Sequence, residues 1–159
     1  MQAILYEVKI RLTSSWLGSQ NTKERVRRFR RDKNGRMVVD LAQWHWAFKQ
    51  AAEALHMEDV DTTTIYPQDN IVFPTLVLYR RNYTHNNKQQ SEMFEAMREN
   101  TVLTFNVLVT GAHGTGTGHQ PDESRLQDIL RFTGMFTGLS PWGGSYGYGR
   151  FDVESVTRK

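Results

Sequence analysis

Residues 122–138 read DESRLQDILRFTGMFTG, and they continue through LSPWGGSYGYG at 139–149 into RFDVESV at 150–156. The first part is predicted to be an amphipathic helix, because Asp122 is a good N-cap and apolar residues follow at helical spacing. The residues of this buried stripe are Leu126, Ile129, Leu130 and Phe136. Gly134 predicts that the helix packs closely on a sheet. The last part is predicted to be a strand, so a glycine- and aromatic-rich loop joins a helix to a strand.

Four further elements precede this unit. Residues 4–12 alternate apolar and polar side chains, which is typical of a half-buried strand. Residues 41–56 repeat apolar side chains at helical spacing behind Asp40, a plausible N-cap. The run at 71–79 is apolar on both faces and is predicted to be a buried strand, and residues 101–110 form another strand with an alternating pattern.

The order strand, helix, strand, strand, helix, strand predicts the α+β class. We expect a ferredoxin-like (βαββαβ) antiparallel sheet with two helices and a long basic insertion after the first strand. The expected organisation is one domain over residues 1–159, with the basic insertion at about 19–37. Polar composition predicts mobile loops at about 80–92 and 111–121.

The charge of the chain is concentrated in the insertion. Between Lys23 and Arg36 there are eight basic and two acidic residues, so this segment carries +6 while the whole chain carries +3. The remainder is therefore at −3. A dense basic segment on a mildly acidic protein indicates a partner rich in phosphate.

Composition also excludes several classes of protein. The chain has no cysteine, which excludes disulfides and thiolate metal sites and indicates a reducing compartment. The first residues lack the pattern of a signal peptide, and no apolar run has the length of a membrane span, so no membrane association is expected. No cofactor is predicted.

Aromatic and basic side chains outside the insertion are the other binding candidates. Trp46 falls on the helix face opposite the apolar stripe that contains Trp44, which predicts an exposed ring. Single-strand binders combine such rings with a cationic groove. The predicted nucleic-acid-binding residues are Lys23, Arg25, Arg27, Arg28, Arg30, Arg31, Lys33, Arg36, Trp46, Arg80, Arg81, Tyr83, Trp142, Tyr146, Tyr148 and Arg150. For each of them the structural interpretation, a solvated charge or a core ring, stays open.

Catalytic interpretations have less support. His113 and His119 lie on a glycine-rich loop without a carboxylate at metal-ligand spacing, although two histidines can act as general acid and base in RNA cleavage. The run GTGTG at 114–118 lacks the Gly-Lys-Ser/Thr of a P-loop. The chain is therefore predicted not to be an enzyme.

Three stretches carry a resemblance to a known family. They are residues 29–52, with a turn, an extended piece and a helix ending in small residues; the strand at 102–109; and the helix, glycine loop and strand at 129–153. Together they resemble small bacteriophage proteins related in fold to the RAMP superfamily, the RNA-binding proteins of CRISPR effector complexes. The resemblance implies a ferredoxin-like core and, by analogy, binding of single-stranded nucleic acid. The chain departs from RAMP nucleases because it has no convincing catalytic cluster.

The sequence thus predicts a non-enzymatic, sequence-tolerant bacteriophage protein that binds single-stranded nucleic acid, DNA before RNA, during replication or transcription. It would act in the cytoplasm of the infected bacterial host, as a homo-oligomer, and RNA polymerase of host or phage is a further expected partner. Two alternatives stay open. One is a phage protein that binds a host protein, such as RNA polymerase or a defence complex, and the other is a RAMP-like RNA endonuclease.

Overall fold

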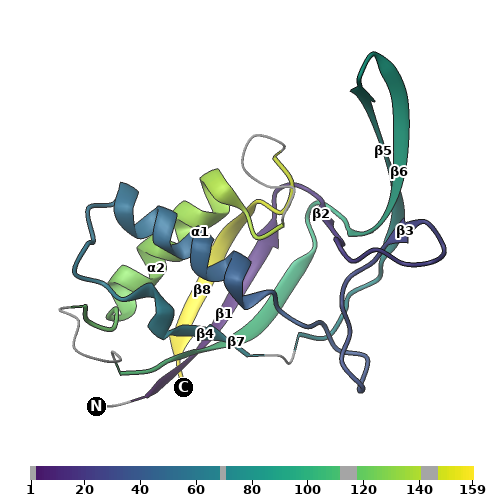
Figure 1. The fold of residues 1–159 in the computed structure, drawn as a ribbon. Coiled ribbons are helices and arrows are strands. Elements are labelled where there is room, and N and C mark those ends of the chain that lie inside the picture. The colour runs from purple at the N-terminus through teal and green to yellow at the C-terminus, as the bar shows by residue number, and fades with distance from the viewer. Residues whose placement is uncertain (1–2, 69–70, 112–117, 141–146) are drawn as a thin grey trace.

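Within the residues that the structure describes, the chain forms two four-stranded sheets, and two helices cover one face of the first sheet (Figure 1). The computed structural model describes residues 3–68, 71–111, 118–140 and 147–159. The second sheet projects from one end of the first as a long hairpin with short strands at its base (Figure 1). The site candidates are distributed between these two parts.

The first sheet has the strand order β4-β7-β1-β8, and all its pairs are antiparallel. Its strands are β1 (Ile4–Leu12), β4 (Ile65–Pro67), β7 (Val102–Val109) and β8 (Phe151–Arg158). With helices between β1 and β4 and between β7 and β8, this is the ferredoxin-like arrangement, so the predicted fold class is confirmed. The basic insertion follows β1, as predicted.

Both helices begin where the sequence predicts. Helix α1 (Leu41–Ala54) is capped by Asp40, whose carboxylate accepts from the backbone N–H of Gln43, and α2 (Glu123–Phe132) is capped in the same way by Asp122. A 3₁₀ turn, η1 (Thr62–Thr64), precedes β4. The core lies between the helices and the sheet, where alternate residues of β1, from Tyr6 to Leu12, are at most 2% exposed.

Helix α2 continues into a single stretch of π-helix, η2 (Thr133–Thr137). The wider turn of a π-helix rotates the residues after it relative to the α-helical stripe. Phe136 is consequently 55% exposed, and its ring packs on the ring of Phe132 at 4.6 Å between centroids. The prediction that Phe136 is buried is therefore wrong, whereas Leu126, Ile129 and Leu130 are buried as expected.

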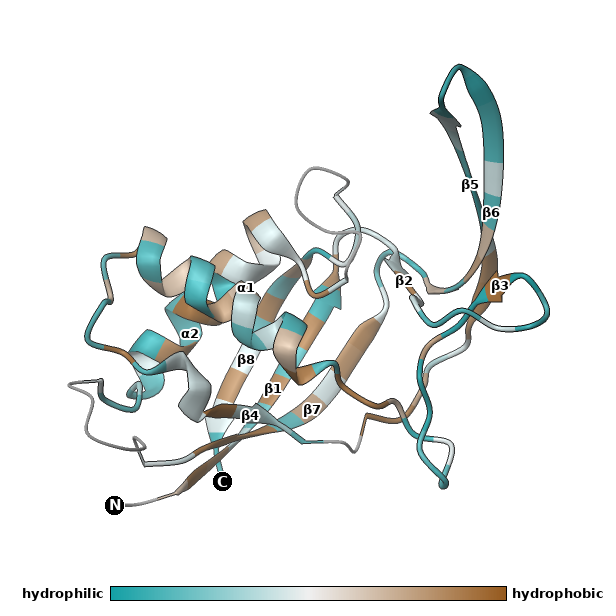
Figure 2. Ribbon diagram, viewed as in Figure 1, coloured by the Kyte–Doolittle hydropathy of each residue, from teal (hydrophilic) through white to brown (hydrophobic). Residues whose placement is uncertain are grey.

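The second sheet is built on a hairpin. Strands β5 (Val77–His85) and β6 (Lys88–Met97) pair along their whole length, and the other edge of β6 pairs with β2 (Trp16–Leu17) and β3 (Val26–Arg27). The outer half of the hairpin is hydrophilic (Figure 2). Near the base, Phe94 and Ala96 of β6 are buried with Leu17 in a small apolar cluster.

Two expectations about this region are wrong. The core strand after α1 is β4, three residues long, rather than residues 71–79; that run enters strand structure only at Val77, in the other sheet. It is apolar because Ile71 is buried in the core and Phe73 and Leu76 pack against it. The predicted loop at 80–92 is instead strand on both sides of a turn at Asn86 and Asn87, which both have positive φ.

Gly134 lies against the sheet, as its position in the sequence predicts. A Cβ at this residue would overlap the carbonyl oxygen of Phe151 and approach its ring to 2.8 Å. We expect Gly134→Ala to lower the free energy of unfolding by about 2–3 kcal/mol, because the helix must move off β8. Urea denaturation measures the change. Met135→Ala, at a neighbouring residue that is 58% exposed, is the control and should have little effect; equal stability of the two variants would contradict the packing.

No helix within the described residues is long and apolar enough to cross a membrane.

Candidate nucleic-acid interface

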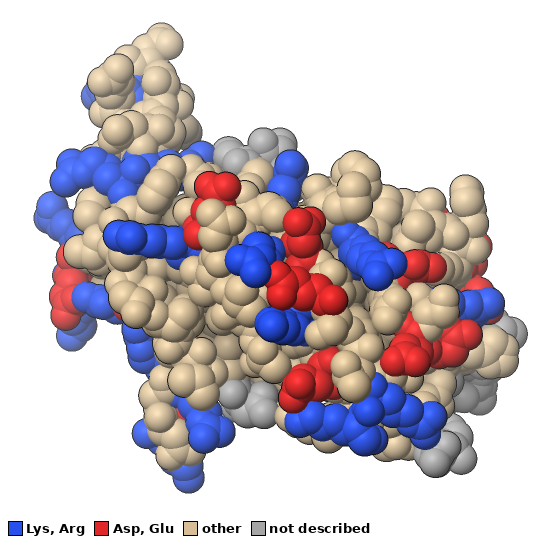
Figure 3. Space-filling model, turned by 180° about the vertical axis from the view of Figure 1, so that it is seen from behind, with Lys and Arg blue, Asp and Glu red and all other residues tan. Residues whose placement is uncertain are grey.

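Positive charge is segregated onto the second sheet and the segments that join it to the core. Residues 13–37 and 71–98 contain twelve Lys and Arg and four Asp and Glu, a formal charge of +8. Because the chain as a whole is at +3, the rest is at −5. Seen from behind, Lys and Arg side chains gather over the end that carries the hairpin, whereas Asp and Glu lie mostly over the sheet (Figure 3). The charge difference between these two parts, +8 against −5, is larger than that between the insertion and the rest of the chain, +6 against −3.

The basic insertion is neither a helix nor a simple hairpin. Its strand β3 pairs with β6, and the chain makes one turn before β3 and another after it. In the first turn, the Thr22 hydroxyl donates to the carbonyl oxygen of Val26 at 2.7 Å. In the second, Asp32 Oδ1 accepts from the backbone N–H groups of Asn34 and Arg36, and Gly35 has φ of +75°. Both turns hold cationic side chains away from the body of the protein.

Three of the eight cations of the insertion are used to hold it on the hairpin. Arg27 pairs with Glu92 at 2.8 Å, and Arg31 pairs with Glu95 at 2.6 Å. Arg28 lies between Glu24, at 2.7 Å, and Glu95, at 3.2 Å. Sequence reasoning assigned these three arginines to phosphate, and it missed both glutamates because they lie more than 60 residues away.

Glu95 is the centre of this attachment. Its side chain is 6% exposed, and besides the two arginines it accepts from the backbone N–H of Phe29 at 3.0 Å. Burial raises the pKa of Glu95, but the hydrogen bonds from Arg31 and Phe29 and the two nearby positive charges outweigh it, so the pKa lies below its usual value. Glu95 is therefore ionised at neutral pH and fixes the course of the insertion.

The remaining five cations of the insertion are exposed and form no ion pair within the described part of the chain. They are Lys23, Arg25, Arg30, Lys33 and Arg36. Lys23 and Arg25 lie at the first turn, and Lys33 and Arg36 lie at the second. These are the side chains with charge available to an external polyanion.

The hairpin carries two of the predicted aromatic and basic residues on one face. Arg81 and Tyr83 alternate with Arg80, which lies on the opposite face. The Arg81 guanidinium lies 5.2 Å from the centroid of the Tyr83 ring. The Tyr83 hydroxyl donates to Glu92 at 2.7 Å, and this hydrogen bond is the main cause that raises the Tyr83 pKa. Arg27, Glu92 and Tyr83 thus form a continuous polar row across β3, β6 and β5.

Tyr148 lies at the base of the same face. Its hydroxyl is 3.1 Å from that of Tyr79, with the two rings in an edge-to-face contact, and burial raises its pKa. It packs against the small apolar cluster of the second sheet. Tyr148 is therefore partly a structural residue that connects the end of the glycine loop to the hairpin.

The other predicted residues are dispersed. Trp46 is 51% exposed on α1, as predicted, and it does not belong to the second sheet. Arg150 is half-buried. Its backbone N–H donates to Ser14 Oγ at 3.0 Å, which connects it to the segment that follows β1. Trp142, Tyr146 and His113 lie outside the described residues.

The face of the first sheet that is turned away from the helices carries paired charges of both signs. On β1 this face presents Glu7, Lys9 and Arg11. Arg11 and Lys9 both pair with Glu154 of β8, at 2.7 and 3.7 Å, and Glu7 pairs with Lys159 at 3.3 Å. Positive and negative charges therefore neutralise each other over this face, and the excess positive charge lies at the second sheet.

Of the two histidines considered as catalytic candidates, His119 lies within the described residues, and its backbone pairs with the chain before η1. His119 forms a bridge to Val60, and its carbonyl oxygen accepts from Asp61 at 2.8 Å. Across residues 3–68, 71–111, 118–140 and 147–159, no three His, Asp or Glu side chains are grouped so that they would hold a metal ion.

Comparison with known proteins supports the fold. No protein-family model matches the chain. No curated protein matches it either. Among solved structures, the chain is similar to a chain in the cryo-EM structure of the Type III-B Cmr-beta bound to cognate target RNA, with a TM-score of 0.62 and 10% identity. The match covers 99% of this chain and 61% of that one, so this chain spans less than two thirds of its neighbour. At this identity the likeness concerns the fold alone.

Proposed function

We propose that this protein binds single-stranded nucleic acid without catalysing a reaction, and that the second sheet with its basic insertion is the binding surface. The observation that carries the proposal is the segregation of charge, +8 on this part against −5 on the rest, with five exposed cations of the insertion that form no ion pair within the described residues. Lys and Arg that replace counterions on phosphates supply affinity without reading sequence. Binding is therefore tolerant of sequence and strongly dependent on salt.

The hairpin adds contacts that a duplex does not offer. Tyr83 presents a ring next to the Arg81 guanidinium, and stacking of a base on such a ring contributes about 1–3 kcal/mol. Only an unpaired base exposes its flat face to this stacking, so a single strand is preferred over a duplex. Trp46 is a second exposed ring, on α1, for a strand that extends beyond the hairpin.

The finer part of the proposal is that the strand is DNA and that the protein acts in bacteriophage replication or transcription. RNA is the other candidate, and the likeness in fold to a chain of a complex bound to target RNA favours it. The two share phosphates and stackable bases, and a hydrogen bond to the 2′-hydroxyl is what distinguishes them at a protein site.

Fluorescence anisotropy tests the proposal with three labelled ligands of one sequence: single-stranded DNA, the matching duplex, and single-stranded RNA. Each is titrated at low and at high salt. We expect a single strand to bind more tightly than the duplex and to lose affinity steeply with salt, and the ratio of DNA to RNA affinity assigns the strand. Absence of binding to all three at low salt would refute the proposed function.

A further inference from the structure

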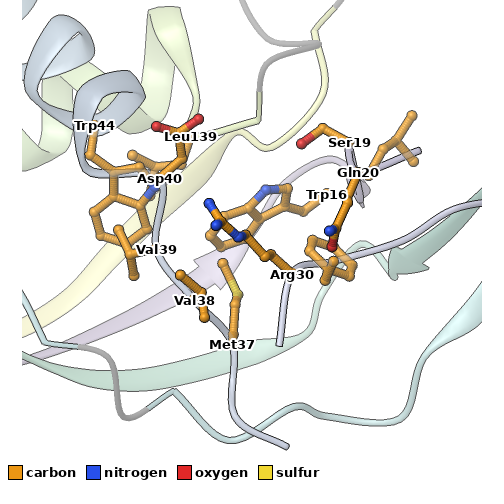
Figure 4. A pocket seen from close by; sticks show the side chains of 12 residues that line it. Trp16, Ser19, Gln20, Arg30, Met37, Val38, Val39, Asp40, Trp44 and Leu139 are labelled. Carbon is orange, nitrogen blue, oxygen red and sulfur yellow. The ribbon is translucent and has the colours of Figure 1, made fainter. Parts of the chain in front are cut away.

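A cavity of about 260 Å³ opens between the two parts of the molecule, at the start of α1 (Figure 4). It is bounded by β2, by the chain after β3, and by residues 37–40, which lead into the helix. The volume is below the roughly 300–1,000 Å³ of pockets that hold drug-sized ligands, so there is room for one flat ring system rather than for a larger molecule.

The walls of the cavity are aromatic and rigid. Trp16 is in contact with Phe29 and with Trp44, at centroid distances of 6.0 and 6.1 Å, and the three side chains are at most 5% exposed. Met37 and Val39 add apolar surface. Rings held by one another in this way keep the shape of the cavity, and they favour a flat apolar face as its occupant.

The polar side chains of the cavity are a cation, an anion, an amide and the hydroxyl of Ser19. Arg30, Asp40 and Gln20 all line it. Asp40 uses one carboxylate oxygen, Oδ1, to cap α1 by accepting from Gln43 at 3.2 Å. Within the described residues neither Arg30 nor Asp40 forms an ion pair, although both border the same space. A donor, Arg30, and an acceptor, Asp40, therefore border the cavity without neutralising each other.

The position of Arg30 connects the cavity to the basic insertion. Arg30 lies between the buried Phe29 and the paired Arg31, and its carbonyl oxygen accepts from Val38 at 2.9 Å. The same short stretch thus forms part of the cavity wall and part of the cationic surface. Phosphates bound at Arg30 would therefore lie beside the cavity.

We propose that the cavity receives one unstacked base of the bound strand and that it prefers guanine. This inference rests on the proposed function. The aromatic walls suit the face of a base, as in proteins that flip a base into a pocket. Guanine alone among the common bases offers Arg an acceptor pair at O6 and N7 and offers a carboxylate the N–H donors on its other edge. The bases of the rest of the strand are not recognised.

The test compares short oligothymidylate strands that carry one central guanine, one adenine or one abasic site. Anisotropy is measured with the unmodified protein and with Asp40→Asn. Asparagine still caps a helix, so this change removes the anionic acceptor while the fold is kept. We expect the guanine strand to bind about tenfold more tightly than the abasic strand, and Asp40→Asn to bring this ratio close to one.

Asp122→Asn is the matched control, because it makes the same substitution at the cap of α2, where the carboxylate accepts from Arg125 at 2.8 Å. It should keep the preference for guanine. A separate titration with guanosine monophosphate, followed by tryptophan fluorescence, distinguishes a base in a strand from a free nucleotide. Free nucleotide binding as tight as the strand would overturn the proposal.

The remaining outcomes separate the two levels of inference. If guanine, adenine and abasic strands all bind with one affinity, the cavity does not hold a base, while the proposed function stands. If none of the strands binds, the proposed function fails and the base pocket fails with it.

Discussion

Replacing Lys23, Arg25, Lys33 and Arg36 together with glutamine is expected to weaken binding of single strands by up to about 600-fold at 0.1 M salt. For single strands each phosphate contact contributes roughly 0.7 to the slope of log K against log salt, so the loss of four contacts lowers this slope by up to about 2.8. The measurement is an anisotropy titration at four or more salt concentrations. The effect should be the same for unrelated sequences.

The choice of these four residues follows from the ion pairs of the insertion. Arg27, Arg28 and Arg31 belong to the same dense segment, but Glu92 and Glu95 hold them. Their removal would alter the fold of the insertion together with its charge. The four chosen side chains are exposed and lie at the two turns, so glutamine removes charge there and leaves the attachment to β6 intact.

The control removes cations from the other part of the molecule. Lys49, Arg131 and Arg158 are exposed on α1, α2 and β8. Their replacement with glutamine should leave both affinity and salt slope close to those of the unmodified protein. If this control loses as much affinity per charge as the variant of the two turns, net charge alone governs binding and the second sheet is not the interface.

Glu95→Ala is expected to lower the free energy of unfolding by about 3 kcal/mol. The carboxylate is buried and accepts from Arg28, Arg31 and the backbone N–H of Phe29, and its removal leaves these donors without their partner. Breaking a buried pair in this way costs about 3–5 kcal/mol, and the lower end applies because both arginines are partly exposed. Urea denaturation followed by tryptophan fluorescence measures the change.

Glu24→Ala is the natural comparison, because Glu24 pairs with the same Arg28 but its side chain is 68% exposed. An exposed pair contributes at most about 1 kcal/mol, so this variant should remain close to the unmodified protein. If the two variants were equally stable, Glu95 would not be the centre of the attachment.

Because the pKa of Glu95 is lowered in the folded protein, the stability that Glu95 contributes depends on pH. Its value in the folded protein lies below the 4.5 of an ordinary glutamate. The stabilisation is therefore fully present above pH 4.5 and is lost as the pH falls through the folded-state pKa. The unmodified protein should lose more stability on acidification than Glu95→Gln, whose amide does not titrate.

Local signals were enough to predict the elements of the ferredoxin-like core. The strands at 4–12 and 102–109 alternate cleanly, and the caps at Asp40 and Asp122 lie next to the helices that they begin. Strand β4 could not be recognised, because three residues show no periodicity. Its pairing with β7 comes from the tertiary fold.

The hairpin was missed for a different reason. Its outer half is polar on both faces, so hydrophobic alternation is absent and the composition is that of a loop. The signal that remained was Asn86-Asn87, a pair of residues that tolerates positive φ and is suited to a two-residue turn between strands. The outer half of the hairpin is held by the pairing of β5 with β6 rather than by burial of its side chains.

For the basic insertion, the sequence predicted a dense group of cations but not which of them form ion pairs within the protein. The density of cations between Lys23 and Arg36 indicated a polyanion, and five of the eight are indeed exposed outside ion pairs in the described structure. Which arginines serve the fold depends on Glu92 and Glu95, and no local pattern relates residues so far apart. The cavity is likewise built from segments that only the tertiary structure brings together.

The central position of β1 also governs how the chain reaches this structure. Ile4 pairs with Val109, and Tyr6 pairs with Arg158, so both partners of the central strand come from the distant second half of the sequence. Contacts of such high sequence separation raise the contact order, and we expect this chain to fold more slowly than a helical bundle of similar size. Until β7 and β8 reach β1, neither edge of β1 has a partner strand, so forming the sheet requires these long loops to close.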